Sequence, residues 1–359
     1  MKNLRQISIA IIRDNQAQSG AYVASPTFSQ YGYSWFRDGM WIAHSMDCVG
    51  QHDSATAFHR WAARTLELHA HKIEQLLEKI QTGQTLVESD YLPTRFMLDG
   101  AIGQENWTDF QLDGYGAWLW GAVQHCQNHK PDLWQEIRPA VALLVKYLET
   151  IWHYPNYDCW EEFRHEQHLS TFAALYGGLK AVADYDPELI PTHLPGRIKA
   201  FALSYGVTDD GNFMKFIANP EVDASLLWTA IPFGLVTVDH LIFQQTLQKI
   251  ETDLYRKGGG VYRYCADTYF GGGEWLLLAT WLAWVYIELG RLDEAQSIMQ
   301  WVSSQADENN HLPEQVEDHL LNEGYFDGWV ENWGTSASPL LWSHAMYLIV
   351  QSLLKEKSL

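Results

Sequence analysis

Two acidic segments of the sequence contain residues that could do chemistry on a sugar. Residues 157–162 read Tyr-Asp-Cys-Trp-Glu-Glu, which places Glu161 and Glu162 directly after a tryptophan. Further along the chain, Glu314 follows Pro313, a residue that breaks regular structure. Hydrolysis of a glycosidic bond needs one carboxyl group that protonates the leaving oxygen and a second that activates water or attacks carbon. Glu161 and Glu314 could divide these two roles.

The residues around Glu161 support a sugar site only in part. The indole of Trp160 would shield Glu161 from water and so favour the protonated form that a general acid needs. Glu162 cannot easily point the same way, and we expect it to accept hydrogen bonds from sugar hydroxyls. A Glu-Glu doublet in an acidic chain is more often an exposed surface feature, however. The hypothesis therefore depends on other segments.

Aromatic residues lie beside charged or amide side chains in three such segments. We expect most of the 17 tryptophans to fill the core and those in polar segments to stack on sugar rings. In residues 31–39, Arg37 and Asp38 offer a fork of donors and a pair of acceptors, as vicinal hydroxyls require. The alternative is an ion pair at the start of a helix. The other segments are residues 107–114, with Trp107, Gln111 and Asp113, and residues 263–275, with Arg263, Asp267, Glu274 and Trp275.

These segments need a scaffold that brings them together, and the sequence predicts a helical one. Apolar residues recur at helical spacing, for example over residues 141–148, whereas the alternation typical of strands is scarce. Because loops carry function on a rigid scaffold, a closed ring of six helical hairpins would present the polar segments at one end. We predict an all-α (α/α)6 barrel, in one domain over residues 1–359, with a tight turn at residues 209–212. The predicted helices lie near residues 2–16, 38–49, 53–81, 110–127, 131–152, 168–184, 187–205, 222–230, 237–255, 273–289, 291–306 and 338–355.

Composition narrows the class of protein. The net charge of -20, from 44 acidic and 24 basic residues, argues against binding to nucleic-acid phosphates. The first residues lack the apolar core of a signal peptide, and no apolar run approaches the roughly 20 residues that span a bilayer. The four cysteines show no paired spacing, as is usual for reduced thiols. We expect a cytoplasmic protein that acts on a small carbohydrate, binds neither nucleic acid nor membrane, and is a monomer or small homo-oligomer.

Seven motifs in order resemble those of glycoside hydrolase family 15, the glucoamylase-like enzymes, over nearly the whole chain. They are Trp35-Phe36-Arg37-Asp38, residues 111–116, Trp160-Glu161-Glu162, residues 223–227, Arg263-Tyr264 through Trp275, residues 312–315 and residues 339–345. Each motif is weak alone, but the ordered set is specific. The resemblance implies an (α/α)6 barrel, a general acid at Glu161, a general base at Glu314 and inversion at the anomeric carbon.

The resemblance also implies which residues bind the sugar. Tyr31 and Glu162 would contact the glucose at the non-reducing end, together with the Trp35-Phe36-Arg37-Asp38 segment. Trp107, Arg263 and Trp275 would surround the scissile bond and the next unit. With the segments described above, the predicted substrate-binding residues are Tyr31, Trp35, Arg37, Asp38, Trp107, Gln111, Asp113, Trp160, Glu162, Arg263, Asp267, Glu274, Trp275 and Trp342. We predict neither a metal nor a cofactor.

The length of the chain shapes the expected substrate. Prokaryotic relatives commonly carry an N-terminal β-sandwich domain, but few residues precede Trp35 or follow Trp342, so neither that domain nor a starch-binding module fits. We therefore expect action on short soluble gluco-oligosaccharides, as in the isomaltose-hydrolysing members that the chain is similar to. Glu274 is then an extra substrate or water contact or, alternatively, a carboxylate at a helix start favoured by the helix dipole.

The sequence gives little support to some other functions and leaves others open. Residues 165–168 have the wrong spacing for a zinc-binding helix, the glycines of residues 271–273 match no nucleotide loop, and no serine lies in a nucleophile elbow. Trehalase activity is the nearest alternative to the proposed α-glucosidase. An inverting phosphorylase would use phosphate in place of a base, so the presence of Glu314 argues against that activity. The rival from another class is a glucoamylase-like domain kept for carbohydrate sensing.

Overall fold

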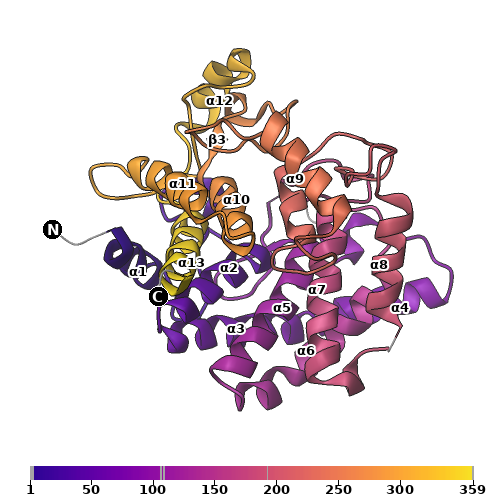
Figure 1. The fold of residues 1–359 in the computed structure, drawn as a ribbon. Helices are drawn as coiled ribbons and strands as arrows, with labels where there is room; N and C mark the ends of the chain where they lie inside the picture. Colours follow the sequence, from indigo (N-terminus) through magenta and orange to yellow (C-terminus); the bar gives the residue numbers. More distant parts are fainter. Residues whose placement is uncertain (1–3, 106, 108–109, 192, 358–359) are drawn as a thin grey trace.

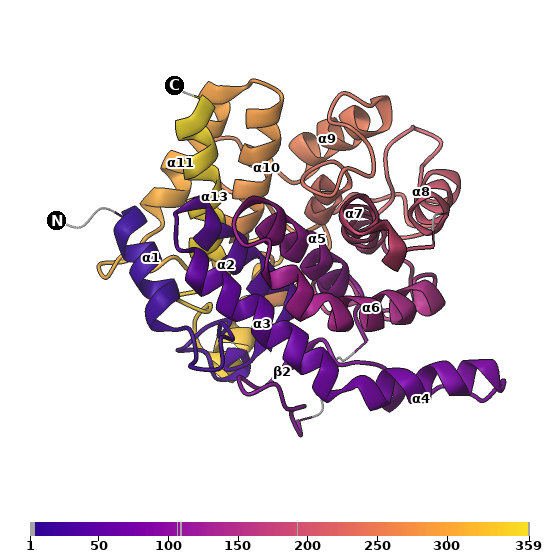
Figure 2. The same ribbon diagram turned by 90° about the horizontal axis from the view of Figure 1, so that it is seen from below.

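The helices form an inner and an outer layer (Figure 1), and Figure 2 shows the same chain turned by 90°. The computed structural model describes residues 4–357 except 106, 108, 109 and 192. Within these residues the inner helices contact one another in a closed ring: α2 (Phe36–Cys48), α5 (Asp113–Asn128), α7 (Leu169–Tyr185), the 3-10 helix η4 (Ala224–Thr229), α10 (Leu276–Glu288) and α13 (Leu341–Lys357). The outer helices are α1 (Leu4–Asp14), α3 (His52–Leu68), α4 (Ala70–Gln81), α6 (Leu133–Ile151), α8 (Leu194–Tyr205), α9 (Leu241–Asp253) and α11 (Leu292–Ser304). The fold is the predicted (α/α)6 barrel.

Inner and outer helices differ in how much of their surface is apolar. Every residue of α10 except Glu288 is buried, so this inner helix is covered on all sides. The outer helix α6 buries one face instead, with Val141, Leu144, Val145 and Leu148 inside. The apolar periodicity of this segment therefore predicted both the helix and its buried face.

Two glycines allow α5 and α7 to pack closely. A Cβ atom on Gly178 would lie 2.0 Å from the carbonyl oxygen of Gly116, and one on Gly116 would lie 2.6 Å from the backbone of Ala174. Any side chain at these positions would push the two helices apart. The contact holds the first turns of α5, which begins at Asp113, against the ring.

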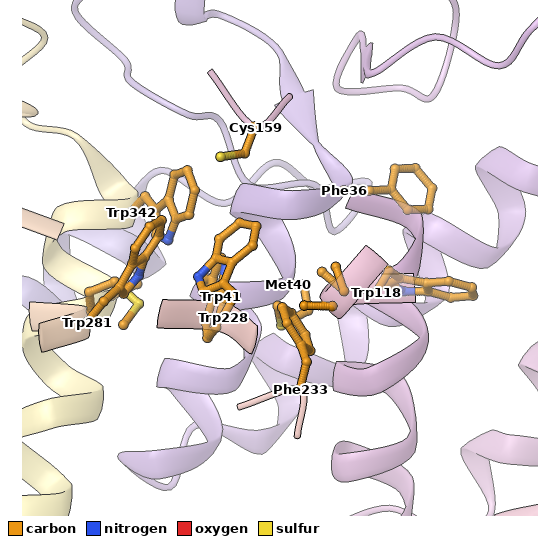
Figure 3. Packing of buried hydrophobic residues seen from close by; sticks show 14 of the residues in the cluster. Phe36, Met40, Trp41, Trp118, Cys159, Trp228, Phe233, Trp281 and Trp342 are labelled. Carbon is orange, nitrogen blue, oxygen red and sulfur yellow. The ribbon is translucent and has the colours of Figure 1, made fainter. Parts of the chain in front are cut away.

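Indole rings fill the centre of the ring of helices (Figure 3). Trp41 of α2 packs on Trp228 of η4 with ring centroids 5.9 Å apart, and Trp228 packs on Trp281 of α10 at 4.8 Å. Trp281 contacts Trp342 of α13 at 5.8 Å. A chain of aromatic contacts thus runs from the core to Trp342, at the start of α13.

Some predicted helix boundaries were wrong. The helix predicted over residues 53–81 is two helices, α3 and α4, which meet at His69. The helix predicted over residues 187–205 begins only at Leu194, because Pro191 lacks the backbone donor that a helix interior needs.

Two further segments differ in structure from the sequence-based prediction, and a third segment agrees with it. In place of the α-helix predicted over residues 222–230, residues Ala224–Thr229 form η4, a tighter 3-10 helix. An unpredicted helix, α12 (Phe326–Trp333), lies beyond the barrel near the top of Figure 1. The predicted turn at residues 209–212 is confirmed by an antiparallel bridge between Val207 and Phe213, with Gly211 at a φ of 85°.

Two short ribbons lead into inner helices. β1 (Ser34–Trp35) runs directly into α2 and pairs antiparallel with β2 (Arg95–Phe96), with Trp35 opposite Arg95. β3 (Glu274–Trp275) runs directly into α10 and pairs with β4 (Gln315–Val316), with Trp275 opposite Gln315. The ribbons hold these indoles at the starts of helices. No helix in the described ranges has both the length and the apolar character needed to cross a membrane.

Candidate active site

A cavity of about 380 Å³ opens where the inner helices α2, α10 and α13 begin. Its volume lies in the range of small-molecule sites. Both predicted catalytic carboxylates line it, and so do nine of the predicted substrate-binding residues: Tyr31, Trp35, Arg37, Asp38, Trp107, Trp160, Arg263, Trp275 and Trp342. Segments far apart in the sequence therefore meet in one pocket.

Glu161 is held by two indole donors. The Nε1 group of Trp35 donates to Oε1 of Glu161 at 2.7 Å, and Nε1 of Trp107 donates to Oε2 at 2.5 Å. The Nε1 group of the neighbouring Trp160 donates to both carboxylate oxygens of Asp223 at 3.0 Å. Both oxygens of Glu161 are thus oriented by residues distant in sequence.

A tight turn sends the two adjacent glutamates in different directions. Oδ1 of Asp158 accepts from the backbone N–H groups of Trp160 at 3.0 Å and Glu162 at 2.9 Å. Glu161 has a φ of 66°, a conformation that residues with a Cβ rarely adopt. Burial raises the pKa of Asp158 to about 8, although the charge of Lys215 opposes the rise. The turn explains why Glu161 and Glu162 have different partners.

Glu314, the second predicted catalytic carboxylate, also lines the pocket and is almost fully buried. The hydroxyl of Tyr31 donates to Oε1 of Glu314 at 2.9 Å and is 2.9 Å from the hydroxyl of Tyr269. The side chain of Gln315 donates weakly to Oε2 at 3.4 Å. Burial raises the pKa of Glu314 to about 7, while the hydrogen bond from Tyr31 and the charge of Arg263 lower it. This carboxyl group can therefore change its protonation state near neutral pH.

Arg37 and Asp38 form the ion pair that the sequence left as the alternative to sugar binding, with Nε of Arg37 at 3.3 Å from Oδ2 of Asp38. Both line the pocket. Burial raises the pKa of Asp38 to about 6, against the charge of Arg37. Gln111 and Asp113 were predicted to bind substrate but do not line the pocket. They lie behind it and hold Arg37, whose Nη1 donates to Gln111 Oε1 at 2.8 Å and lies 3.5 Å from Asp113 Oδ2.

Arg263 has a similar support from two predicted sugar ligands. Asp267 is fully buried and accepts from Nε and Nη2 of Arg263 at 2.7 and 2.5 Å. Glu162 accepts from Arg263 at 3.3 Å and from the hydroxyl of Tyr264 at 2.5 Å. Asp267 and Glu162 do not line the pocket. In this structure their carboxylates are hydrogen-bonded to the arginine that faces the cavity, and their direct contact with sugar stays a prediction.

Glu274 is another predicted ligand that lies outside the pocket. Its carboxylate is fully buried, pairs with Arg256 and accepts from the backbone N–H of Gly260 at 2.7 Å. Glu274 precedes α10 in strand β3, so it is not a residue of the helix start either. It stabilises the fold of the 256–274 segment.

Arg95 lies behind the pocket and contacts aromatic residues that line it, which the sequence did not reveal. Its guanidinium carbon lies 3.7 Å from the ring centroid of Trp107, 5.6 Å from that of Trp35 and 3.9 Å from that of Tyr33. Arg95 also pairs with Glu105 at 2.7 Å. It thereby holds both indoles that donate to Glu161. A lone arginine in the sequence carries no signal of this role.

An aromatic wall at the pocket was also missed. Phe28, Tyr269, Trp329 and Trp333 line the cavity, and Trp329 stacks on Phe28 with the rings 6.1 Å apart and 9° from parallel. Trp333 is 51% exposed. The spacing of Phe326, Trp329 and Trp333, at i, i+3 and i+7, is typical of a helix with an aromatic face and could have indicated α12.

Comparisons with known proteins agree with this site. The family model described as glycosyl hydrolases family 15 matches residues 2–187. An isomaltose glucohydrolase of Kribbella flavida is 39% identical over 357 residues, which cover 98% of this chain and 92% of that protein. The chain belongs to glycosyl hydrolase family 15. This family 15 enzyme is thus a glycoside hydrolase with a six-hairpin barrel.

Two other relatives bear on what the family 15 enzyme acts on. A solved glycosidase variant in complex with glucose has a TM-score of 0.93 and 39% identity, covering 98% of this chain and 96% of that chain. Trehalase 2 of Sulfolobus acidocaldarius is 25% identical over 315 residues, which cover 79% of this chain and 53% of that protein.

Replacing Glu274 with glutamine should lower the stability of this family 15 enzyme by about 2 kcal/mol, because Arg256 would lose its charged partner at a buried site. The melting temperature measures the loss. Glu188→Gln is a matched control, since Glu188 is exposed and pairs with Arg138 at the surface. An unchanged melting temperature combined with a raised KM would show that Glu274 binds substrate after all.

Proposed function

We propose that this family 15 enzyme is an exo-acting, inverting α-glucosidase. It removes the non-reducing glucose from short α-glucosides, with isomaltose as the preferred substrate. The observation that carries the proposal is that Glu161 and Glu314 line one small pocket rich in indole rings. The 39% identity to an isomaltose glucohydrolase over 98% of the chain supports the choice of isomaltose.

The two carboxyl groups have distinct proposed roles. Glu161 protonates the leaving oxygen, and the indole donors of Trp35 and Trp107 fix the direction of its carboxyl group. Glu314 activates water from the opposite face of the sugar. Inversion requires room for that water, so we expect the carboxyl groups to lie about 6.5 to 9.5 Å apart in a complex with substrate.

The pocket also offers polar groups for the bound glucose. Arg37 and Asp38 line the cavity side by side, and Nε1 of Trp275 and of Trp342 are buried without a hydrogen-bond partner among the described residues. Buried polar atoms are usually satisfied, so sugar hydroxyls are natural partners for these groups. We propose that these residues bind the non-reducing glucose, while Gln111, Asp113 and Asp267 position the two arginines.

The pH dependence of hydrolysis should report on Glu314. Burial raises the pKa of Glu314 to about 7, and a general base acts only when ionised. We expect kcat/KM for isomaltose to rise with pH, with the midpoint of the acidic limb near 7. Because the hydrogen bond from Tyr31 lowers this pKa, Tyr31→Phe should move the midpoint to higher pH.

Tyr33→Phe is the matched control for this measurement. Tyr33 lies in the same segment but packs against Arg95 and Trp35, and no hydrogen bond to Glu314 is recorded for it among the described residues. Its replacement should leave the acidic limb in place. If the midpoint of the acidic limb does not move in Tyr31→Phe, the hydrogen bond from Tyr31 does not influence the pKa of the base.

One experiment tests substrate and stereochemistry together. The enzyme is incubated with isomaltose, maltose, panose, trehalose and maltotetraose, and the anomer released first is followed by NMR. We expect isomaltose to be hydrolysed fastest and β-glucose to appear first. Release of α-glucose would refute inversion, and fastest hydrolysis of trehalose would make the enzyme a trehalase. Failure on every substrate would favour a carbohydrate-sensing role.

The setting in which the enzyme works is also a proposal. The cysteines Cys48, Cys126, Cys159 and Cys265 are all free thiols, which supports the cytoplasm as its location. We further propose that residues 1–359 act as one catalytic unit, because one continuous hydrophobic core runs through the ring of helices.

A further inference from the structure

A cluster of histidines surrounds Asp47 at the end of α2 that is farther from the pocket. Asp47 lies in the last turn of α2, ten residues beyond Arg37, which corresponds to about 15 Å along the helix. His52 is the first residue of α3, and His129 directly follows the last residue of α5. Three helix ends therefore meet at this point.

The side chains of the cluster converge on a common space. The carboxylate of Asp47 and one ring nitrogen from each of His52 and His129 all lie within 4.8 Å of one another. Nδ1 of His52 is 2.9 Å from Oδ1 of Asp47, and the imidazole rings of His52 and His129 are stacked with centroids 4.1 Å apart. We propose that Asp47, His52 and His129 bind one zinc-type divalent metal ion.

A fourth residue orients the carboxylate from behind. Nδ1 of His125 lies 2.8 and 3.0 Å from the two oxygens of Asp47, and its Nε2 lies 2.9 Å from the hydroxyl of Thr56. His125 is fully buried. Such hydrogen bonds to a ligating side chain fix its direction in metal sites and contribute strongly to affinity. The carboxylate is therefore already held in place for a metal.

Charge and access at the cluster also suit a cation. The C-termini of α2 and α5 lie here and carry partial negative charge, whereas the N-terminus of α3 at His52 carries partial positive charge. The ion pairs recorded for Asp47, among the residues that the structure describes, are with His52 and His125. The side chain of His52 is 42% exposed and His129 is exposed, so a metal can enter from solvent and keep a bound water.

The donor set decides the class of metal. Two imidazole nitrogens and one carboxylate favour zinc, nickel or copper over magnesium and calcium, which prefer all-oxygen sites. No metal-binding spacing in the sequence indicates these three ligands, because they come from α2, α3 and the end of α5. A metal there would tie the outer helix α3 to the inner helices α2 and α5. We therefore expect it to stabilise the barrel without taking part in hydrolysis.

Calorimetric titration of the chelator-treated enzyme, residues 1–359, with zinc chloride tests the proposal. We expect one zinc ion per chain and a rise in melting temperature of about 3 °C at a free zinc concentration of roughly 100 times Kd. His52→Ala and His129→Ala should each weaken zinc binding by at least about tenfold. Their kcat on isomaltose should stay within about twofold of the parent, since the pocket lies at the other end of α2.

The control is His71→Ala, which removes an exposed histidine of α4 outside the cluster and should bind zinc as the parent does. His129 is exposed, so His129→Ala is expected to fold even if His52→Ala does not, and circular dichroism checks both. Absence of zinc binding by the parent enzyme would overturn the proposal. Zinc affinity equal to that of the parent in His129→Ala would overturn it as well.

Discussion

Replacing Glu161 with glutamine is expected to lower kcat for isomaltose by roughly 1000-fold, because an amide cannot protonate the leaving oxygen. The geometry adds to this loss. Trp35 and Trp107 donate to the two oxygens of Glu161 at 2.7 and 2.5 Å. In a glutamine, the amide NH2 is itself a donor, so it would face one of these indole donors and find no acceptor there. Steady-state release of glucose measures kcat and KM.

Two comparisons identify the lost function as that of the acid. α-Glucosyl fluoride has a leaving group that needs no proton, so Glu161→Gln should retain far more activity on it than on isomaltose. Glu162→Gln is the neighbouring control: Glu162 pairs with Arg263 and Tyr264, and its replacement should act mainly on KM. Near-normal turnover of isomaltose by Glu161→Gln would refute the role of Glu161.

Glu314→Gln should also lower kcat by roughly 1000-fold, but on both substrates. A base is needed to activate water whatever group leaves, so the fluoride should not rescue this variant. The contrast between the two variants on the fluoride assigns acid and base to Glu161 and Glu314. Equal rescue of both would contradict the division of roles.

The same substitution should stabilise the folded enzyme at alkaline pH. Burial raises the pKa of Glu314 from 4.5 to about 7, so ionising it costs more in the folded than in the unfolded chain. The cost is absent below pH 4.5, grows between pH 4.5 and 7, and reaches about 3 kcal/mol above pH 7. We expect Glu314→Gln to melt at a higher temperature than the parent at pH 8 but not at pH 4. The same difference at both pH values would contradict this account of Glu314.

Much of the scaffold could be predicted because helical periodicity is a local property. The apolar pattern of α6 depends only on residues within a few turns, and it predicted the buried face correctly. The errors arose where local signals conflicted with other constraints. Residues 222–230 have helical composition but adopt a tighter 3-10 turn as the inner element η4, and Pro191 delays the start of α8.

The candidate site was predicted in outline for a different reason. Residue types that suit sugar chemistry cluster in short segments, so Glu161, Arg37 and Trp275 could be singled out from their neighbours alone. Whether a carboxylate faces the pocket or supports its wall depends on partners elsewhere in the chain. Asp113 reaches Arg37 from 76 residues away, and buried Glu274 is taken up by Arg256.

By itself, the sequence determined the helical barrel, the two acidic segments and the aromatic character of the site, because each is written in residues close along the chain. Only the tertiary structure decided which side chains share the pocket. Trp35, which donates to Glu161, is 126 residues from it in the sequence, and Tyr31, which donates to Glu314, is 283 residues from it. Such partners, and the roles of Arg95 and the Asp47 cluster, follow from how distant helix ends pack, and no local pattern encodes that packing.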